Sequence, residues 1–239
     1  MISAVIDRGN SSTKIGLFQD GHLLRTSELD YHNMSNFFAQ HPVESSILSS
    51  VVPLTNTDLK EFYNISSRSI LLTSDTPLPI GLNYHTRTTL GTDRIASAVG
   101  SSRYCKGHRL IIDAGTCITY DWVDNNNVFR GGIISLGRAM RAQAMHEFTG
   151  LLPRVDLEDT WELIGTSTTE CILSGVQEGC IAEARVIIEK MEDRVGDLKV
   201  LFTGGDAVFF EKQLEIDSFV VSNLVLEGLD EILSFNGGI

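Results

Sequence analysis

The sequence is poor in positive charge. Its 239 residues contain 19 Lys and Arg against 31 Asp and Glu, which gives a formal net charge of −12, and no segment gathers Lys and Arg into a basic stripe. Non-specific binding to nucleic acid or to an anionic membrane needs such a positive surface. Nucleic acid and membrane partners are therefore not expected.

Long apolar runs, clustered metal ligands and closely spaced cysteines are also missing. Runs such as residues 110–112 are interrupted by charge long before the roughly 18 residues that a membrane span requires, and the first residues lack the basic start of a signal peptide. Cys105, Cys117, Cys171 and Cys180 lie too far apart for a Cys-x-x-Cys motif, and the six histidines show no zinc-binding spacing. These absences predict a cytoplasmic protein with reduced thiols and no zinc site.

What is present is an ordinary globular composition with α/β patterning. Hydrophobic residues make up 42% of the chain and charged residues 21%, which argues against disorder and against a disulfide miniprotein. The length suits about one or two domains. Strand-like residues 45–52 and 69–73 flank a helix-like stretch at 55–64, and this alternation is typical of α/β layering.

The chain repeats a three-stranded pattern. The predicted strands of the two copies are residues 2–7, 13–18, 22–27, 110–113, 117–122 and 128–134. Asp7 and Asp113, like Gly9 and Gly115, stand 106 residues apart. A strand that ends in Asp before an x-Gly-polar turn places a carboxylate beside several backbone N–H groups, which together hold a cation and phosphate oxygens. Each turn alone is equally typical of an ordinary β-turn, but two copies at matched positions favour a duplicated phosphate-binding fold.

The second half of the chain adds helices and a glycine-containing loop. Residues 137–148 are predicted to be helical, with Arg138 and Arg141 as surface charges. Ser167 and Glu170 form a capping box before a long helix. Its expected buried face, with a residue every fourth position, is Ile172, Val176, Cys180, Ala184 and Ile188.

A third short strand at 199–202 leads into Thr203-Gly204-Gly205-Asp206, and residues 224–233 form an amphipathic closing helix. The paired glycines allow a planar group to lie against bare backbone. The same pair is equally compatible with a simple tight turn.

A polar loop between the two repeats leads into a predicted helix at Gly91-Thr92-Asp93-Arg94. Thr92 is predicted as the N-cap with Asp93 in the first turn, positions that helix capping alone would favour. Capping does not account for the adjacent Arg94, or for a carboxylate placed between two phosphate-type turns. Asp93 is therefore a candidate acceptor of a hydroxyl proton, and Arg94 a candidate partner of a substrate carboxylate.

Six segments together resemble type III pantothenate kinase, in the order and with the spacing of that family. They are residues 7–14, 91–94, 113–119, 131–134, 164–168 and 203–206. The resemblance spans the whole chain, and the set is specific although no single member is. It implies the α/β fold of the acetate and sugar kinase/Hsp70/actin superfamily, with two similar actin-like (ribonuclease H-like) domains and a nucleotide cleft between them.

The implied domains are 1–107, with the first phosphate loop and the substrate loop, and 108–239, with the second phosphate loop and the adenosine loop. The implied reaction transfers the γ-phosphoryl group of ATP to pantothenate, giving 4'-phosphopantothenate in the first step of coenzyme A biosynthesis. The implied enzyme is a homodimer that uses ATP, Mg²⁺ and a monovalent cation, K⁺ or NH₄⁺.

The resemblance also implies roles for individual residues. Asp93 is the implied catalytic proton acceptor, Asp113 the ligand of the monovalent cation, and Asp7 a candidate Mg²⁺ ligand. The implied ATP-binding residues are Asp7, Arg8, Gly9, Asn10, Ser11, Ser12, Thr13, Lys14, Thr116, Gly204 and Gly205. The implied pantothenate-binding residues are Tyr84, Gly91, Thr92, Asp93, Arg94 and Thr168.

The chain departs from familiar patterns at three of these places. It contains no Gly-x-x-x-x-Gly-Lys-Ser/Thr sequence, so Lys14 is not interpreted as a Walker lysine. Arg87 and Leu136 stand where prolines are common in the family. Both departures loosen loops, and the first affects the loop that carries Tyr84.

Two other functions stay open at this point. Another kinase of the same superfamily would keep both phosphate loops and differ at Tyr84, Arg94 and Thr168. A non-enzymatic regulator would keep the nucleotide-binding fold, although the presence of both Asp93 and Asp113 argues against lost activity. A dinucleotide oxidoreductase ranks lower, because no Gly-x-Gly-x-x-Gly opens a helix after a strand.

Overall fold

The computed structural model describes residues 2–9 and 12–237. The chain forms two compact units. The first unit contains residues 1–105, 127–130 and 223–239, and the second contains residues 106–126 and 131–222. Each unit is built around its own β-sheet, and each is described separately below.

The first unit contains a five-stranded sheet in the described residues, with the order β3-β2-β1-β4-β5. Its strands are β1 (Ile2–Arg8), β2 (Thr13–Gln19), β3 (His22–Leu29), β4 (Ser45–Ser50) and β5 (Arg68–Leu71). Strands β1, β2 and β3 pair in antiparallel fashion, whereas β4 pairs with β1 in parallel. The predicted meander is therefore confirmed, and it is extended on the side of β1 by two parallel strands.

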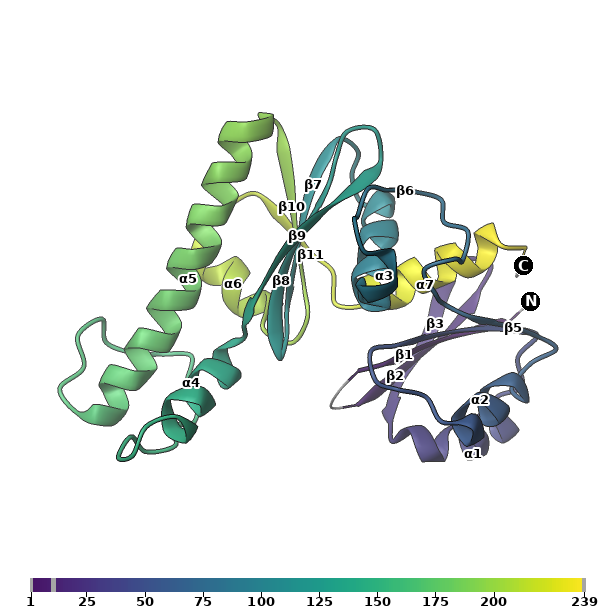
Figure 1. Ribbon diagram of the computed structural model, residues 1–239, viewed down its shortest axis with the longest axis horizontal. Coiled ribbons are helices and arrows are strands. Elements are labelled where there is room, and N and C mark those ends of the chain that lie inside the picture. Colours follow the sequence, from purple (N-terminus) through teal and green to yellow (C-terminus); the bar gives the residue numbers. More distant parts are fainter. Residues whose placement is uncertain (1, 10–11, 238–239) are drawn as a thin grey trace. The chain divides into compact units, whose positions relative to one another are not determined.

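Helices cover both faces of the first sheet (Figure 1). They are α1 (Met34–Gln40), α2 (Asn56–Tyr63), α3 (Thr92–Gly100) and α7 (Leu224–Phe235), with short 3₁₀ helices at Tyr31–Asn33, Arg87–Thr89 and Ser101–Arg103. Side chains of α1 and α2, such as Met34, Phe38 and Phe62, share one buried core with Ile6 and Ile15 of the sheet. The sheet is thus buried on both faces, as an α/β layer requires.

Helices α3 and α7 approach each other at glycine. A Cβ atom on Gly228 would overlap the carbonyl oxygen of Ala96, and one on Gly100 would lie 2.6 Å from the carbonyl oxygen of Leu224. Only glycine permits backbones to approach this closely. The closing helix predicted at 224–233 therefore belongs to the first unit, where it holds the helix that begins with the substrate motif.

The second unit repeats the same sheet. Its strands are β7 (His108–Ala114), β8 (Cys117–Val123), β9 (Val128–Leu136), β10 (Leu198–Thr203) and β11 (Ser218–Val220), in the order β11-β10-β7-β8-β9. Read from the opposite edge, this order corresponds to β3-β2-β1-β4-β5. The first three residues of β9 belong to the first unit, where Val128 and Phe129 pair in parallel with β6 (Gly81–Leu82). The duplication predicted from the sequence is therefore confirmed.

Helices α4 (Arg138–Glu147), α5 (Thr168–Val195) and α6 (Ala207–Leu214) complete the second unit. The capping box of Ser167 and Glu170 opens α5 as predicted. The residues of α5 expected to be buried, from Ile172 to Ile188, are all buried. No helix among the described residues combines the length and the apolar character needed to cross a membrane.

Two predictions about side chains are wrong. Thr92 is the first residue of α3 rather than its N-cap, which is Gly91, and the Thr92 hydroxyl instead lies 2.9 Å from that of Ser49. Arg138 is not a surface charge, because it is only 4% exposed and bonds to Asp206 and Gln177. In both cases the polar side chain interacts with a residue that is distant in the sequence.

Candidate active site

The first candidate carboxylate lies where β1 meets the first turn. In the parallel pairing of β1 with β4, Asp7 stands opposite Ser49, which is fully buried. Ser49 hydrogen-bonds to Asp7, and its hydroxyl is 2.9 Å from that of Thr92. A chain of hydroxyl groups therefore connects Asp7 to the residue that precedes Asp93. Sequence reasoning missed Ser49, because only the register of the parallel pair reveals it.

The environment of Asp7 disfavours its charge. Burial, helped by the negative charge of Asp93, raises the pKa of Asp7 from 3.8 to about 6, against the opposing effects of Ser49 and Lys14. Its Oδ1 atom is shielded from solvent and has no hydrogen-bond partner in the part of the chain that the structure describes. A buried carboxylate oxygen without a donor is suited to a cation or to a water held by one.

Asp93 lies in the first turn of α3. Burial raises the pKa of its carboxyl group, while the backbone N–H of Arg94, 2.8 Å from Asp93 Oδ1, and the positive charge of Arg94 lower it. Both carboxylates are therefore stronger bases than an exposed Asp. A pair of neighbouring acids with raised pKa values is a recognised property of catalytic sites.

A buried aromatic ring brings two predicted substrate residues together. The guanidinium carbon of Arg94 lies 5.8 Å from the ring centroid of Phe129, and the ring of Tyr84 lies 6.0 Å from the same centroid. Arg87, where the family commonly has proline, donates a hydrogen bond of 2.9 Å to the carbonyl of Leu82. This contact closes the loop that carries Tyr84, so it supplies part of the restraint that a proline would give.

The first turn is only partly described. The N–H of Gly9 donates to the carbonyl of Ser12 at 3.0 Å, and the predicted ATP ligands Asn10 and Ser11 lie outside the described residues. Ser12 and Thr13 line a pocket of about 460 Å³ in the first unit, together with Arg8 and Tyr31.

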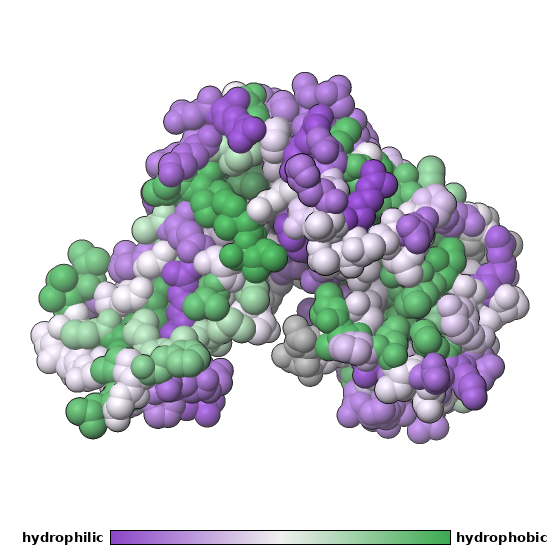
Figure 2. All heavy atoms as spheres, in the orientation of Figure 1, coloured by the Kyte–Doolittle hydropathy of each residue, from purple (hydrophilic) through white to green (hydrophobic). Residues whose placement is uncertain are grey.

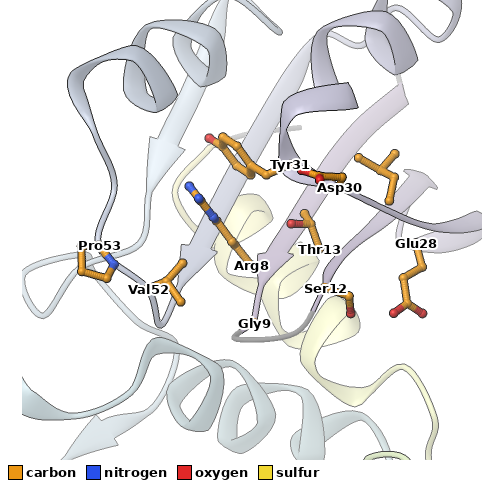
Figure 3. Close-up of a pocket in the computed structure, with 10 residues that line it drawn as sticks. Arg8, Gly9, Ser12, Thr13, Glu28, Asp30, Tyr31, Val52 and Pro53 are labelled. Carbon is orange, nitrogen blue, oxygen red and sulfur yellow. The ribbon is translucent and has the colours of Figure 1, made fainter.

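Within this pocket, Arg8 extends from β1 toward Tyr31 (Figure 3). Its guanidinium carbon lies 4.0 Å from the ring centroid of Tyr31, and Nη1 is 3.0 Å from Asp58 Oδ2. Asp58 also caps α2 with Thr55. Arg8 therefore ties the start of the first turn to α2 through contacts that its place in the motif did not predict.

The second unit holds the matching carboxylate. Asp113 stands opposite Thr203 in the parallel pair of β7 and β10, as Asp7 stands opposite Ser49 in the first unit. A Cβ on Gly204 would lie 2.6 Å from Asp113 Oδ1, and the φ of Gly204 is +88°. Glycine is therefore required at this position for both its conformation and its lack of a side chain.

The remaining predicted residues of the second unit are exposed. Thr116 lies between β7 and β8, and Thr168 is the first residue of α5. Among the described residues, no three His, Cys, Asp or Glu side chains gather into a metal-binding group. The Asp113 carboxylate supplies the kind of oxygen ligand that a hard cation prefers.

Comparison with solved structures gives the class of fold. The chain resembles a Campylobacter jejuni protein assigned to the Baf family of transcriptional activators, with a TM-score of 0.67, 21% sequence identity and coverage of 99% of this chain and 100% of that one. It also resembles the inorganic polyphosphate/ATP-glucomannokinase of an Arthrobacter strain, with a TM-score of 0.53, 12% identity and coverage of 98% and 99%. Together with the two matching sheets, these likenesses define an actin-like α/β fold of the kind found in sugar kinases.

Sequence comparison gives the family. A sequence model described as type III pantothenate kinase matches residues 4–190. The type III pantothenate kinase of Phocaeicola vulgatus is 35% identical over 239 residues, covering 98% of this chain and 99% of that protein. The corresponding protein of Christiangramia forsetii is 39% identical over 241 residues, with the same coverage. The chain belongs to the type III pantothenate kinases, and its activity is the ATP-dependent phosphorylation of pantothenate in coenzyme A biosynthesis.

Proposed function

We propose that Asp93 is the catalytic proton acceptor for the pantothenate hydroxyl. The observation that carries this assignment is the connection from Asp7 through Ser49 to Thr92, beside two carboxylates whose pKa values are raised. A phosphoryl transfer with a loose transition state mainly requires the hydroxyl to be held in line and its proton to be accepted late. A carboxylate with a raised pKa, fixed at the start of a helix, meets both requirements.

Arg94 and Tyr84 are proposed to bind the acceptor. The buried Arg94 presents a cation to the pantothenate carboxylate, and Tyr84 contributes an aromatic surface. Gly91 and Thr92 complete this part of the proposed site, and Thr168 is assigned to substrate binding from its place in the family motif.

The two Asp-x-Gly turns are proposed to bind ATP. Residues 7–14 and Thr116 would hold the phosphates, and Gly204 with Gly205 would lie beside the adenosine. Asp7 Oδ1, which has no hydrogen-bond partner among the described residues, fits Mg²⁺ or one of its waters. When bound, Mg²⁺ offsets the negative charge of the phosphates. Asp113 is proposed to hold the monovalent cation together with nearby carbonyl oxygens.

Release of ADP from Mg²⁺-ATP tests these assignments, with and without pantothenate and with K⁺, NH₄⁺ or Na⁺ as the only monovalent cation. Turnover is expected to require pantothenate and to be faster with K⁺ or NH₄⁺ than with Na⁺. In Asp113→Asn this difference between cations should disappear. Equal rates in all three cations for the unaltered enzyme would contradict the cation site while leaving the kinase activity in place.

Asp7→Asn is expected to stabilise the protein while lowering its activity. Between pH 3.8 and about 6 the folded chain holds a proton that the unfolded chain has released, so the free energy of unfolding falls as the pH rises through this window. Above the window the charged Asp7 costs up to about 3 kcal/mol. At pH 8 the variant should therefore melt several degrees higher than the unaltered chain. Below pH 4 the two should melt at the same temperature. A melting temperature that is equal at pH 8 would contradict the buried charge.

The enzyme is proposed to be a cytoplasmic homodimer, as the family resemblance implies. Apolar side chains are exposed in the segment that joins α4 to α5, and they include Phe148 at 85% and Leu151 at 96%. Hydrophobic residues are visible on the surface at the lower left of Figure 2. Such a surface favours association with another protein surface. Light scattering is expected to give twice the chain mass of 26.3 kDa, and Leu151→Glu should shift the mass toward that of a single chain. A single-chain mass for the unaltered protein at micromolar concentration would contradict the dimer.

A further inference from the structure

A buried arginine in the second unit contacts the loop proposed to lie beside adenosine. Arg138 is only 4% exposed, and its guanidinium carbon lies 3.5 Å from the ring centroid of Phe209. Nη1 donates to Asp206 Oδ1 at 2.9 Å and Nε donates to the Oε1 of the fully buried Gln177 at 2.8 Å. Nη2 faces Asp159 Oδ1 at 3.7 Å. The side chain is therefore held from α5, α6 and the glycine loop together.

The loop 203–206, which Arg138 contacts through Asp206, packs directly on the second Asp-x-Gly turn, at residues 113–117. The N–H of Asp206 donates to the carbonyl of Ala114 at 2.9 Å, next to Asp113. Gly204 packs so closely on the same residues that a Cβ would lie 2.6 Å from Asp113 Oδ1. Displacement of Asp206 would therefore displace the backbone beside Asp113.

The residue before Arg138 contacts the other side of that turn. The N–H of Gly137 donates to the carbonyl of Thr116 at 3.0 Å, and a Cβ on Gly137 would overlap the carbonyl oxygens of Gly115 and Thr116. Arg138 thus lies at the point where α4 begins against the second turn, and its side chain reaches across to Asp206. The backbone of Gly137 and the side chain of Arg138 therefore engage the two proposed ATP loops of this unit.

We propose that Arg138 is a positioning residue for ATP, which fixes the loop 203–206 against the turn 113–117 and so sets the affinity of the second unit for the nucleotide. The inference rests on the proposed contact of that loop with ATP. The guanidinium bonds Asp206 and Gln177 through two different nitrogens held in one plane, and a lysine ammonium does not reproduce this fixed fork. Loss of a buried partner also leaves the other charge uncompensated, which favours rearrangement of the loop.

Arg138→Met tests the inference, because methionine keeps an unbranched side chain and removes the fork. KM for ATP is expected to rise about tenfold, within the usual range of coupling between neighbouring sites, whereas KM for pantothenate and kcat should change less than threefold. Arg138→Lys should recover part of the ATP affinity. All constants are measured below the melting transition of every variant, and Kd for ADP with Mg²⁺ is measured alongside.

Arg141→Met is the matched control. Arg141 lies one turn further along α4 and also forms an ion pair, with its Nη2 2.6 Å from Glu183 Oε2. Its other side-chain hydrogen bonds go to Leu136 and Ser135, which lie outside the turn 113–117 and the loop 203–206. A merely structural role for Arg138 predicts that both variants lower the melting temperature and neither changes KM for ATP. That result would overturn the inference.

Gly205→Ala separates failure of the inference from failure of the proposed function. Apart from its two chain neighbours, no atom of the described residues lies within 4 Å of a Cβ at Gly205, so alanine mainly alters the surface that the loop offers to ATP. If KM for ATP rises in Gly205→Ala but is unchanged in Arg138→Met, the loop is part of the ATP site and Arg138 does not position it. No change in either variant would reject both.

If Arg138→Met does not fold, Arg138→Lys and Asp206→Asn carry the test. Each alters one side of the ion pair and retains a polar side chain at that position. A rise in KM for ATP in both, with a combined effect smaller than the product of the two, supports the inference because the residues then act as one unit. Unchanged KM values in both would overturn it.

Discussion

Asp93→Asn is expected to lower kcat about 10²- to 10⁴-fold, the range for loss of a general base. Asparagine has nearly the same shape and can still accept the N–H of Arg94, which lies 2.8 Å from Asp93 Oδ1, so the start of α3 should keep its geometry. KM for pantothenate should change by a few fold at most. Steady-state ADP release with saturating ATP and pantothenate measures the effect.

Two controls show that the loss belongs to the chemical step. The variant should bind ATP as the unaltered chain does, and it should melt no lower at pH 8, because it removes a partly buried negative charge that raises the pKa of Asp7. A folded, ATP-binding Asp93→Asn with kcat within tenfold of the unaltered enzyme would show that another group accepts the proton.

Gly228→Ala is expected to be the most destabilising of the substitutions considered, by about 3 kcal/mol or more. The new methyl group would overlap the carbonyl oxygen of Ala96 and approach the backbone of Gly100, and backbone atoms cannot rotate aside as a side chain can. Helices α3 and α7 would have to separate, and α3 carries Asp93 and Arg94. The melting temperature should fall by about 6 °C or more, and kinase activity should fall with it.

Gly175→Ala is the control for this substitution. Gly175 lies in the exposed face of α5, and apart from its neighbours in the helix no atom of the described part of the chain would lie within 4 Å of a Cβ there. Alanine should raise the free energy of unfolding by about 0.5–1 kcal/mol, through its higher helix propensity. If both variants changed the melting temperature equally, the close approach of α3 and α7 would not be what requires glycine at position 228.

Several features could be predicted from the sequence because they depend on near neighbours. The capping box of Ser167 and Glu170 requires residues three apart, and the buried face of α5 follows from the helical period. The two meanders follow from alternating runs and turns, and their matching positions predicted a duplicated fold, which the two sheets confirm. The family motifs then predicted the class of fold and the activity, which the relatives confirm.

Other features could not be predicted because they depend on contacts between distant segments. Nothing near Ser49 in the sequence indicates that the parallel register places it opposite Asp7. Arg138 has the pattern of a helix surface residue, and it becomes buried only because Asp206 and Gln177, 68 and 39 positions away, supply its partners. Thr92 loses the role of N-cap to Gly91 because Ser49 offers its hydroxyl another contact.

The sequence by itself therefore determined the duplicated α/β architecture, the start of α5 at its capping box, and the family to which the chain belongs. Local hydrogen bonds and hydrophobic periodicity are encoded within a few residues, and the motifs are preserved as short strings. The tertiary structure alone decided which hydroxyl group contacts Asp7, which arginine is buried, and where two helices need glycine. Those outcomes follow from register and close packing between segments distant in the chain, and no local pattern specifies them.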